Sequence, residues 1–412
     1  MGDRIYGLLG RTLAHSWSVP IHRSLGCPDY RLWEREPEEL EAFLAQDIGG
    51  VNVTIPYKRA VLPCCDEIDE TARRIGSVNT LVRRNGRLCG WNTDAAGFRL
   101  MARRAGIGFA GAKTLILGSG GASLTAAAMA RELGAASVTV ISRSGPDDYQ
   151  HLSRHRDAEL VVNATPVGMY PRTGEAAVDL AAFPRCRGVL DLIYHPRRTA
   201  LLLQAEELGI PCSDGLPMLV AQAAAAEELF FGRSIPESTV ETLLAQLRRD
   251  KQNIVLIGMP GSGKSTVGAA LAALTGRQAV DVDEEIVRRT GCSIPDLFAR
   301  RGEDAFRALE REETARWGRE TGLILITGGG VVKDPANRAS LRQNGRVYQL
   351  ERAVYLLSRE GRPLSEHADL GRLYQERLPL YARFRDAAVD NNRPAEDTAA
   401  AVWRDFCEHS GD

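Results

Sequence analysis

The sequence lacks a long apolar run, an excess of charge of either sign and any region of low complexity. In 412 residues no apolar stretch approaches the roughly 18 that a membrane-spanning helix needs, and the N-terminus lacks a signal-peptide layout. Lys and Arg number 52 against 53 Asp and Glu, a formal net charge of −1. This nearly equal number of positive and negative charges gives no indication of a surface that binds nucleic acid or membrane. We therefore expect a cytoplasmic protein whose partners are small molecules.

Signatures of disulfides and metal sites are also missing. The eight cysteines are scattered, with Cys64 and Cys65 adjacent and no C-x-x-C pair, and the seven histidines show no metal-ligand spacing. This pattern indicates reduced thiols in a cytoplasm. Hydrophobic residues make up 44% and charged residues 25%, which is typical of a globular chain, and the length predicts two to three domains.

The clearest motif is a glycine-rich loop at residues 258–266, GMPGSGKST. It follows the apolar run Ile254–Ile257 and precedes a helical pattern over residues 267–274, the strand–loop–helix context of a phosphate-binding P-loop. Glycines let backbone N–H groups turn toward phosphate oxygens, and the helix N-terminus adds partial positive charge. Lys264 would reach the β- and γ-phosphates of ATP, and Ser265 would bind Mg²⁺. The predicted ATP-binding residues are Gly261, Ser262, Gly263, Lys264, Ser265 and Thr266.

The first hundred residues alternate short apolar runs with helical patterns, as an α/β layer does. Residues 5–9 and 50–58 are typical of strands, and residues 78–82 with 87–90 indicate a hairpin around the favoured turn pair Asn85-Gly86. The loops carry groups suited to a polyhydroxylated acid, although any one of them alone is more typical of a turn or an exposed charge. These groups are Ser16, Ser18, Thr54, Lys58, Asn79 and Asp94.

Together these loops resemble the substrate domain of the shikimate dehydrogenases, through the stretches AHSWS, NVTIPYK, SVNT and WNTDAAGF. The resemblance implies that Lys58 and Asp94 form a catalytic dyad, and that the serines, Thr54 and Asn79 hold the ring hydroxyls and carboxylate. A lysine held beside a carboxylate suits the proton transfer that alcohol oxidation requires. Trp17 departs from the family, which usually has a smaller or basic residue between the two serines.

A second glycine-rich junction, residues 118–123, lies between a strand pattern and a helix pattern at residues 124–133, although Ser123 stands where a third glycine or alanine is usual. A further strand, residues 138–141, arrives where a βαβ unit predicts it. An NAD-binding chain would place a carboxylate after this strand, whereas Arg143 suits the 2′-phosphate of NADP. The alternative is an exposed arginine without such a role. The predicted NADP-binding residues here are Gly118, Ser119, Gly120, Gly121, Ala122, Ser142, Arg143 and Ser144.

Three later segments extend the resemblance to the shikimate dehydrogenases, which covers about residues 4–247. They are residues 161–169, VVNATPVGM, which in the family lie beside the nicotinamide, residues 191–196, DLIYHP, and residues 214–222, DGLPMLVAQ. The resemblance implies further NADP contacts at Asn163, Thr165, Met169, Gly215 and Met218, and further substrate contacts at Tyr194 and Gln222.

After the P-loop, residues 280–283, VDVD, are typical of a buried strand ending in two carboxylates, and alternation along a strand would point Asp281 and Asp283 the same way. With the P-loop they resemble the shikimate kinases over about residues 253–405. The other stretches that carry the resemblance are GEDAFR at 302–307, GGG at 328–330, GRPL at 361–364 and ERLPLY at 376–381.

The resemblance to the kinases implies a role for each motif. Lys264 and Ser265 would serve the nucleotide and Mg²⁺, and Asp281 would hold Mg²⁺ through water. Arg362 would be a lid arginine that meets ATP and the transferring phosphate, although only two residues separate it from Arg359, fewer than the family's lid loop has. The implied shikimate-binding residues are Asp283, which would meet the reacting hydroxyl, Arg307, Gly328, Gly329, Gly330 and Arg377.

The fold class predicted for the whole chain is α/β, a two-lobed dehydrogenase followed by a P-loop kinase with a parallel sheet. The expected divisions are residues 1–104 with 216–247 for shikimate, 105–215 for a Rossmann NADP domain, a charged linker at 248–252, and 253–412 for the kinase. The expected reactions convert 3-dehydroshikimate to shikimate with NADPH and then shikimate to shikimate 3-phosphate with ATP. One alternative is a quinate or shikimate dehydrogenase that uses NAD, fused to a P-loop small-molecule kinase. The other is a non-catalytic regulator, against which stands the presence of Lys58, Asp94, Lys264 and Asp283.

Overall fold

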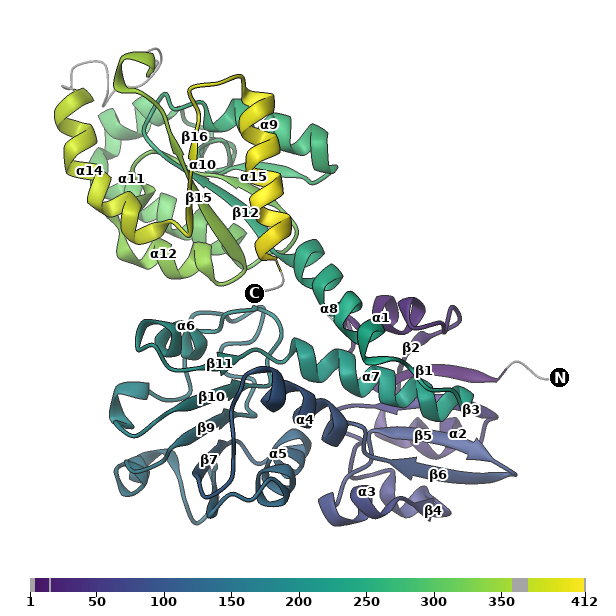
Figure 1. Ribbon diagram of the computed structural model, residues 1–412. Helices are drawn as coiled ribbons and strands as arrows, with labels where there is room; N and C mark the ends of the chain where they lie inside the picture. The colour runs from purple at the N-terminus through teal and green to yellow at the C-terminus, as the bar shows by residue number, and fades with distance from the viewer. Residues whose placement is uncertain (1–3, 15, 358–369, 411–412) are drawn as a thin grey trace. The chain divides into compact units, whose positions relative to one another are not determined.

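The computed structural model describes residues 4–14, 16–357 and 370–410, and the chain divides into two compact units. The first unit comprises Met1–Met169 and Glu175–Leu244, and the second comprises Tyr170–Gly174 and Ala245–Asp412. Both are α/β, as predicted from the alternation of strand and helix patterns (Figure 1). Each unit is built on its own sheets.

The first lobe of the first unit is a six-stranded sheet in the order β2-β1-β3-β5-β6-β4. Strand β3 is buried along its whole length, which explains its largely apolar composition. The expected hairpin forms between β5 and β6, where Asn85 and Gly86 take φ values of 50° and 81°, a two-residue turn whose twist matches that of the strands. The elements are β1 Ile5–Gly10, α1 Ser18–Ser24, β2 Arg31–Glu34, α2 Leu40–Leu44, β3 Ile48–Val53, β4 Glu67–Ile68, α3 Glu70–Ile75, β5 Thr80–Arg84 and β6 Arg87–Trp91.

The second lobe of the first unit is a five-stranded parallel sheet in the order β11-β10-β9-β7-β8. Its strands carry apolar side chains on both faces, because α5 covers one face and α6 the other. Helix α5 begins at Gly121, three residues earlier than the apolar pattern predicted, since the glycine turn itself enters the first helical turn. The elements are β7 Lys113–Leu117, α5 Gly121–Glu132, β8 Ser137–Ile141, β9 Leu160–Asn163, β10 Gly188–Asp191, α6 Ala200–Glu207 and β11 Cys212–Ser213.

Two long helices, α4 Asp94–Arg104 and α7 Leu216–Phe231, lie between the two sheets of the first unit and pack against each other (Figure 1). They approach closely at Gly97, where an added Cβ would collide with the carbonyl oxygen of Met218. A side chain there would push the helices apart. The pair therefore fixes two residues of interest, Asp94 at the start of α4 and Gln222 on α7.

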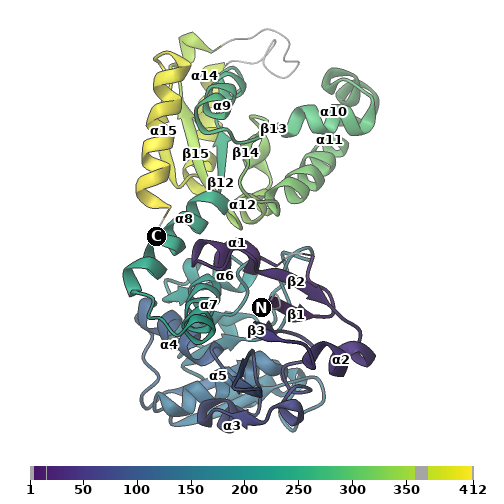
Figure 2. The ribbon, with the colours of Figure 1, turned by 90° about the vertical axis from the view of Figure 1, so that its right-hand side faces the viewer.

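The second unit holds a five-stranded parallel sheet in the order β13-β14-β12-β15-β16. Ile254 and Leu256 pack toward α9 and α15, while Val255 and Ile257 face α12 and α14, so the central strand is buried on both sides. In Figure 2, α10 and α11 lie beyond the edge strand β13. The elements are β12 Asn253–Ile257, α9 Lys264–Thr275, β13 Ala279–Asp281, α10 Val282–Thr290, α11 Ile294–Gly318, β14 Ile324–Ile326, α12 Pro335–Arg342, β15 Gly345–Glu351, α14 Leu370–Phe384, β16 Ala387–Asp390 and α15 Ala395–His409.

The charged stretch expected as a linker is mostly helical. Helix α8 runs from Glu237 to Lys251, and β12 begins two residues later at Asn253. Residues 248–252 include no glycine or proline that would end a helix there. None of the described helices is long and apolar enough to cross a membrane.

Candidate functional sites

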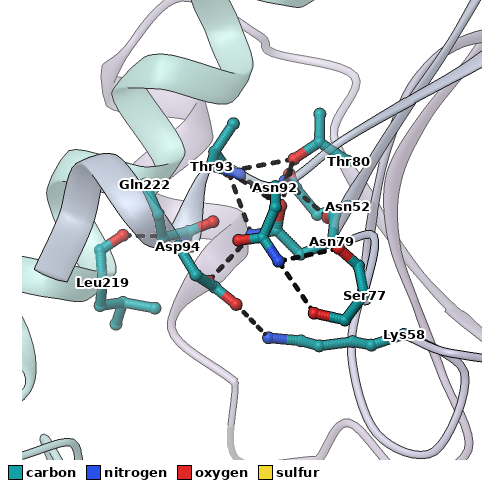
Figure 3. Close-up of polar contacts among 10 residues, drawn as sticks. All are labelled: Asn52, Lys58, Ser77, Asn79, Thr80, Asn92, Thr93, Asp94, Leu219 and Gln222. Carbon is teal, nitrogen blue, oxygen red and sulfur yellow. Dashed lines mark hydrogen bonds and ion pairs between the residues drawn. The ribbon is translucent and has the colours of Figure 1, made fainter. Parts of the chain in front are cut away.

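An ion pair links the two predicted catalytic residues of the first unit. Lys58, in the loop after β3, donates from Nζ to Oδ2 of Asp94 at 2.5 Å, and both side chains are largely buried (Figure 3). Asp94 is the first residue of α4, where the positive end of the helix dipole favours a carboxylate. Its other oxygen, Oδ1, accepts a hydrogen bond from Asn79 at 2.8 Å. Both carboxylate oxygens are therefore held by donors, and Lys58 is oriented by an anion of fixed position.

Asn79 is buried against this pair, and its side-chain amide bonds within the protein. Nδ2 donates to Oγ1 of Thr93 as well as to Asp94, and Oδ1 accepts from the Thr93 backbone N–H at 2.7 Å. Gln222 approaches from α7 on the other side in Figure 3, donating to the Leu219 carbonyl oxygen at 2.9 Å. Asp94 thus lies between Lys58 and Asn79, with Gln222 beside it in Figure 3.

The two predicted serines lie at the start of α1. Ser16 donates from its hydroxyl to that of Ser18 at 3.1 Å and accepts from the Ser18 N–H at 3.2 Å. The intervening Trp17 packs its ring on Tyr194, with centroids 5.0 Å apart, and on His195 at 5.6 Å. Tyr194 follows β10 of the other lobe, so the unusual tryptophan joins the two lobes of the unit. Thr54 follows β3, in contact range of Gly10 at the end of the parallel strand β1.

The glycine turn after β7 lies directly against the dyad lysine. A Cβ added to Gly121 would lie 3.3 Å from Cδ of Lys58, and one added to Gly118, whose φ is 104°, would lie 2.9 Å from the Ala164 carbonyl oxygen. The departure at Ser123 is accommodated because its hydroxyl turns back to donate to the Gly120 carbonyl oxygen at 2.7 Å. The glycine turn and the loop that carries Lys58 are therefore in contact, although they belong to different lobes of the unit.

A buried aspartate secures the loop that follows β9. Asp191 accepts from Nδ2 of Asn163 and the Ile193 N–H, each at 3.0 Å, and from the Thr199 hydroxyl at 2.6 Å. Asn163 in turn accepts from the hydroxyl of Thr165 at 2.7 Å. Burial raises the pKa of Asp191 to about 6 in spite of these donors. The side chain of Asn163, predicted to contact NADP, thus forms hydrogen bonds with Asp191 and Thr165.

The remaining predicted NADP residues differ in how exposed they are. Ser142 is buried, and Arg143 and Ser144 follow β8 with exposed side chains. Met169 is 44% exposed, whereas Met218 lies in the core between α4 and α7. Gly215 lies directly against the backbone of Leu192, so it admits no side chain.

In the second unit the P-loop forms as expected. Gly261 and Gly263 take φ values of 80° and 86°, which favour glycine, and Lys264 begins α9. Nζ of Lys264 donates to the carbonyl oxygens of Gly258 and Met259 at 3.0 Å each. The ammonium group of the buried lysine therefore lies against its own loop. Its positive charge and the N–H groups at the start of α9 are both available to an anion there.

The prediction of a strand across residues 280–283 is wrong. Strand β13 ends at Asp281, which accepts from the Asp283 N–H at 3.0 Å and so caps a helix that contains Asp283. Aspartate is among the residues preferred as helix N-caps. The strand therefore ends at Asp281, two residues earlier than predicted. The other oxygen of Asp281 accepts from the Ser265 hydroxyl at 3.0 Å, so the two predicted Mg²⁺ ligands do meet.

Asp283 lies among charges that oppose its ionisation. Burial, Asp281 and Glu310 raise its pKa to about 7, and Lys264 and Arg307 only partly offset this rise. A Cβ on Gly328 would lie 2.8 Å from Oδ1 of Asp283 and 3.0 Å from Oε1 of Glu310. Both of these buried oxygens are without a hydrogen-bond partner among the described residues. They mark a small polar space beside Gly328.

The other predicted shikimate contacts converge on this space. Nη1 of Arg307 bonds Oε2 of Glu310 at 2.6 Å, and the same guanidinium occupies the position that a Cβ on Gly330 would need. Arg377 donates to the Gly329 carbonyl oxygen at 2.9 Å. A glycine is therefore required at position 330, because the arginine fills the space of a side chain. Arg359 and the predicted lid residue Arg362 lie outside the described residues.

Sequence reasoning missed Glu310, which is fully buried and bridges Arg307 to the polar space. The signal was available, because Glu310 follows Arg307 by three residues and so lies on the same helix face. The residues that the structure describes contain no cluster of three or more His, Cys, Asp or Glu suited to a metal ion.

Three family models match the chain. Residues 8–81 match the shikimate dehydrogenase substrate binding domain, residues 215–244 the shikimate 5′-dehydrogenase C-terminal domain, and residues 260–407 shikimate kinase. Among curated relatives, the shikimate dehydrogenase (NADP(+)) of Symbiobacterium thermophilum is 36% identical over 272 residues, 58% of this chain and 92% of the relative. That of Geobacter sp. is 38% identical over 276 residues, 59% of this chain and 94% of the relative.

Solved structures give the same result. A shikimate dehydrogenase from Peptoclostridium difficile is 34% identical with a TM-score of 0.56, covering 60% of this chain and 98% of its own. A chorismate mutase/shikimate 5-dehydrogenase fusion protein from Clostridium acetobutylicum is 37% identical, also at 0.56, covering 60% and 97%. The Thermus thermophilus shikimate 5-dehydrogenase in complex with NADP(H) and shikimate is 34% identical with a TM-score of 0.53, covering 58% and 98%.

Proposed function

The chain belongs to the shikimate dehydrogenase family and continues into a shikimate kinase domain, and we propose that it catalyses two consecutive reactions. The first unit reduces 3-dehydroshikimate to shikimate with NADPH, and the second transfers a phosphoryl group from ATP to the 3-hydroxyl of shikimate. The observation that carries the proposal is the Lys58–Asp94 ion pair lying against Gly121 of the cofactor turn.

In the first reaction Lys58 handles the proton. NADPH, when bound, supplies the hydride to the carbonyl carbon. Lys58 donates a proton to the oxygen that gains charge, and Asp94 keeps the ammonium group in place through its contact at 2.5 Å. The residues that hold the substrate around this pair are Ser16, Ser18, Thr54, Asn79, Tyr194 and Gln222.

The cofactor preference follows from the end of β8. Arg143 is exposed there, and residues 142–144 include no carboxylate to receive the ribose hydroxyls of NAD. A guanidinium offers paired donors and permanent charge to the 2′-phosphate of NADP. This supports NADP over NAD for the chain.

In the second reaction Asp283 accepts the proton of the 3-hydroxyl. Its raised pKa, about 7, suits a general base that must take up a proton near neutral pH. Arg307 and Arg377 hold the substrate carboxylate, and Lys264 faces the transferring phosphate. Ser265 and Asp281 fit Mg²⁺, because their oxygens lie 3.0 Å apart and hard oxygen ligands suit this ion. Magnesium, when bound, neutralises phosphate charge.

The proposal is tested with the full chain in two assays, NADPH oxidation with 3-dehydroshikimate and ADP release with shikimate. Lys58→Ala should lower reduction by about a hundred-fold or more, because it removes the proton donor. The exposed neighbour Arg59 gives the matched control, and Arg59→Ala should behave as the unmutated chain. A preference for quinate with NAD would replace the proposal with its nearest alternative, and absence of both activities would contradict it.

A further inference from the structure

Three buried polar residues outside the predicted site form a chain of hydrogen bonds that ends at the dyad. They are Tyr30, Asn52 and Thr80, which are 0%, 4% and 0% exposed. Tyr30 directly precedes β2, Asn52 lies on β3, and Thr80 begins β5 opposite Asn52 in the antiparallel register. The proposed function gives none of them a task, although buried polar groups are costly unless they are paired.

Each link of the chain has hydrogen-bond geometry. The Tyr30 hydroxyl donates to Oδ1 of Asn52 at 2.8 Å, and Nδ2 of Asn52 donates to Oγ1 of Thr80 at 3.1 Å. Thr80 donates to Oδ1 of Asn79 at 3.0 Å, and Asn79 donates to Asp94 at 2.8 Å. Figure 3 shows the part from Asn52 to Lys58.

The first donor sets the direction of the links that follow. Burial raises the pKa of Tyr30 well above its usual value, so the phenol keeps its proton. Its ring is stacked on His22 with centroids 3.8 Å apart, which holds the hydroxyl toward Asn52. The Asn52 carbonyl oxygen then accepts the phenol hydrogen, because an amide nitrogen has no acceptor capacity, and the Asn52 amide is left to face Thr80.

The same direction reaches Asn79. Thr80 accepts from Asn52, so its own hydrogen can go to Oδ1 of Asn79 or to the Thr93 hydroxyl, each at 3.0 Å. Thr93 in turn bonds Asn79, because its hydroxyl accepts from Nδ2 and its N–H donates to Oδ1. With these donors on the oxygen, the Asn79 amide faces Asp94. Hydrogen bonds in such a buried network reinforce one another, and a fully satisfied network restricts its members to one arrangement.

We propose that Tyr30, Asn52 and Thr80 are positioning residues of the dehydrogenase, which hold Asn79 and through it the Asp94 carboxylate that orients Lys58. The inference rests on the proposed function of the first unit. Loss of one hydrogen bond of the chain leaves the Asp94 carboxylate less restrained. We therefore expect a lower turnover number with no change at the glycine turn after β7. A residue that serves only the stability of the sheet would not have this selective effect.

The test uses the full chain with Tyr30→Phe, Thr80→Val and the double variant. Tyr30→Phe removes only the hydroxyl, and Thr80→Val keeps the shape of the side chain. Each should lower the turnover number for reduction of the keto substrate by about tenfold while KM for NADPH stays unchanged. The double variant should be about as active as the more impaired single variant, because both changes break one chain and their effects do not add.

Two further variants separate positioning from a general loss of structure. Thr80→Ser keeps the hydroxyl and should restore turnover, whereas Thr125→Val should have no effect. Thr125 is 0% exposed in α5, and its hydroxyl is without a hydrogen-bond partner in the described part of the chain, so it controls for removal of a buried hydroxyl. Both variants are assayed beside the kinase activity of the same chain.

The outcomes are distinct. Normal turnover in both single variants, or a double variant that loses the product of the two single losses, would overturn the inference. A rise in KM for NADPH that accounts for the whole effect would do so as well. If the unmutated chain does not reduce 3-dehydroshikimate at all, the proposed function has failed, and that result is visible before any variant is made.

Discussion

Replacing Glu310 should move the pH dependence of the kinase. Asp283 must be ionised to accept a proton, and its pKa is raised to about 7, so phosphorylation should fall as pH decreases through that value. Glu310 is one of the causes of the raised pKa. A Cβ on Gly328 would lie within 3.0 Å of an oxygen of each carboxyl group, so these two oxygens are at most about 6 Å apart. Glu310→Gln removes the negative charge while keeping the size of the side chain.

The expected shift follows from the charges. Two unit charges about 6 Å apart at an effective dielectric constant of about 20 interact by roughly 3 kcal/mol, equivalent to about two pKa units. Arg307, at 2.6 Å from Glu310, already neutralises part of that charge. We therefore expect the acid limb of kcat/KM for shikimate to move down by about one pH unit.

The matched control is Glu303→Gln. Glu303 also bonds Arg307, at 3.1 Å, but its side chain is 38% exposed and it is not among the groups that most shift the pKa of Asp283. This variant should leave the acid limb in place, so any effect of a loosened Arg307 is measured separately. An acid limb that stays near its original pH in Glu310→Gln would refute the assignment of Asp283 as the titrating group.

Three further predictions concern single residues. Arg143→Ala should raise KM for NADPH about ten- to a hundred-fold and leave KM for NADH nearly unchanged, and equal use of both cofactors by the unmutated chain would refute this. Lys264→Ala should abolish phosphorylation and leave reduction within about twofold, because each reaction has its own catalytic groups, so a large loss of reduction would show coupling. Asp283→Asn should raise Tm at pH 8 but not at pH 4, because a carboxyl group whose pKa is raised to about 7 on folding favours the folded state at low pH and loses this contribution as pH rises through 7; a lower Tm at pH 8 would contradict the sign.

Local sequence was sufficient for features that need only neighbours along the chain. The hairpin at Asn85-Gly86 and the P-loop around Gly263 depend on backbone conformations that few residues other than glycine adopt. Glycine at these positions therefore indicates the backbone conformation directly. The α/β fold class followed from the alternation of apolar runs with helical patterns in the first hundred residues and from the two glycine-rich strand-to-helix junctions.

Features that depend on partners distant in the chain were less accessible. Residues 282 and 283 were expected in a strand but belong to a helix, because the Asp281 side chain caps that helix. The local pattern does not distinguish an aspartate inside a strand from one that caps a helix. Nothing in the sequence around Tyr30 indicates that its hydroxyl meets Asn52, 22 residues away. Likewise Asp191 bonds Asn163 across two neighbouring strands. Such contacts are set by tertiary packing, which a local pattern does not encode.

One measurement tests the central claim most directly, that a single chain performs both reactions. The full chain is incubated with 3-dehydroshikimate, NADPH and ATP, and the products are identified over time. Shikimate 3-phosphate should accumulate with one NADPH and one ATP consumed for each product molecule, and Lys264→Ala should stop at shikimate. Lys58→Ala should form product from 3-dehydroshikimate about a hundred-fold more slowly or worse, and at the normal rate when shikimate is added. Accumulation of shikimate without its phosphate by the unmutated chain, or normal product formation from 3-dehydroshikimate by Lys58→Ala, would contradict the account.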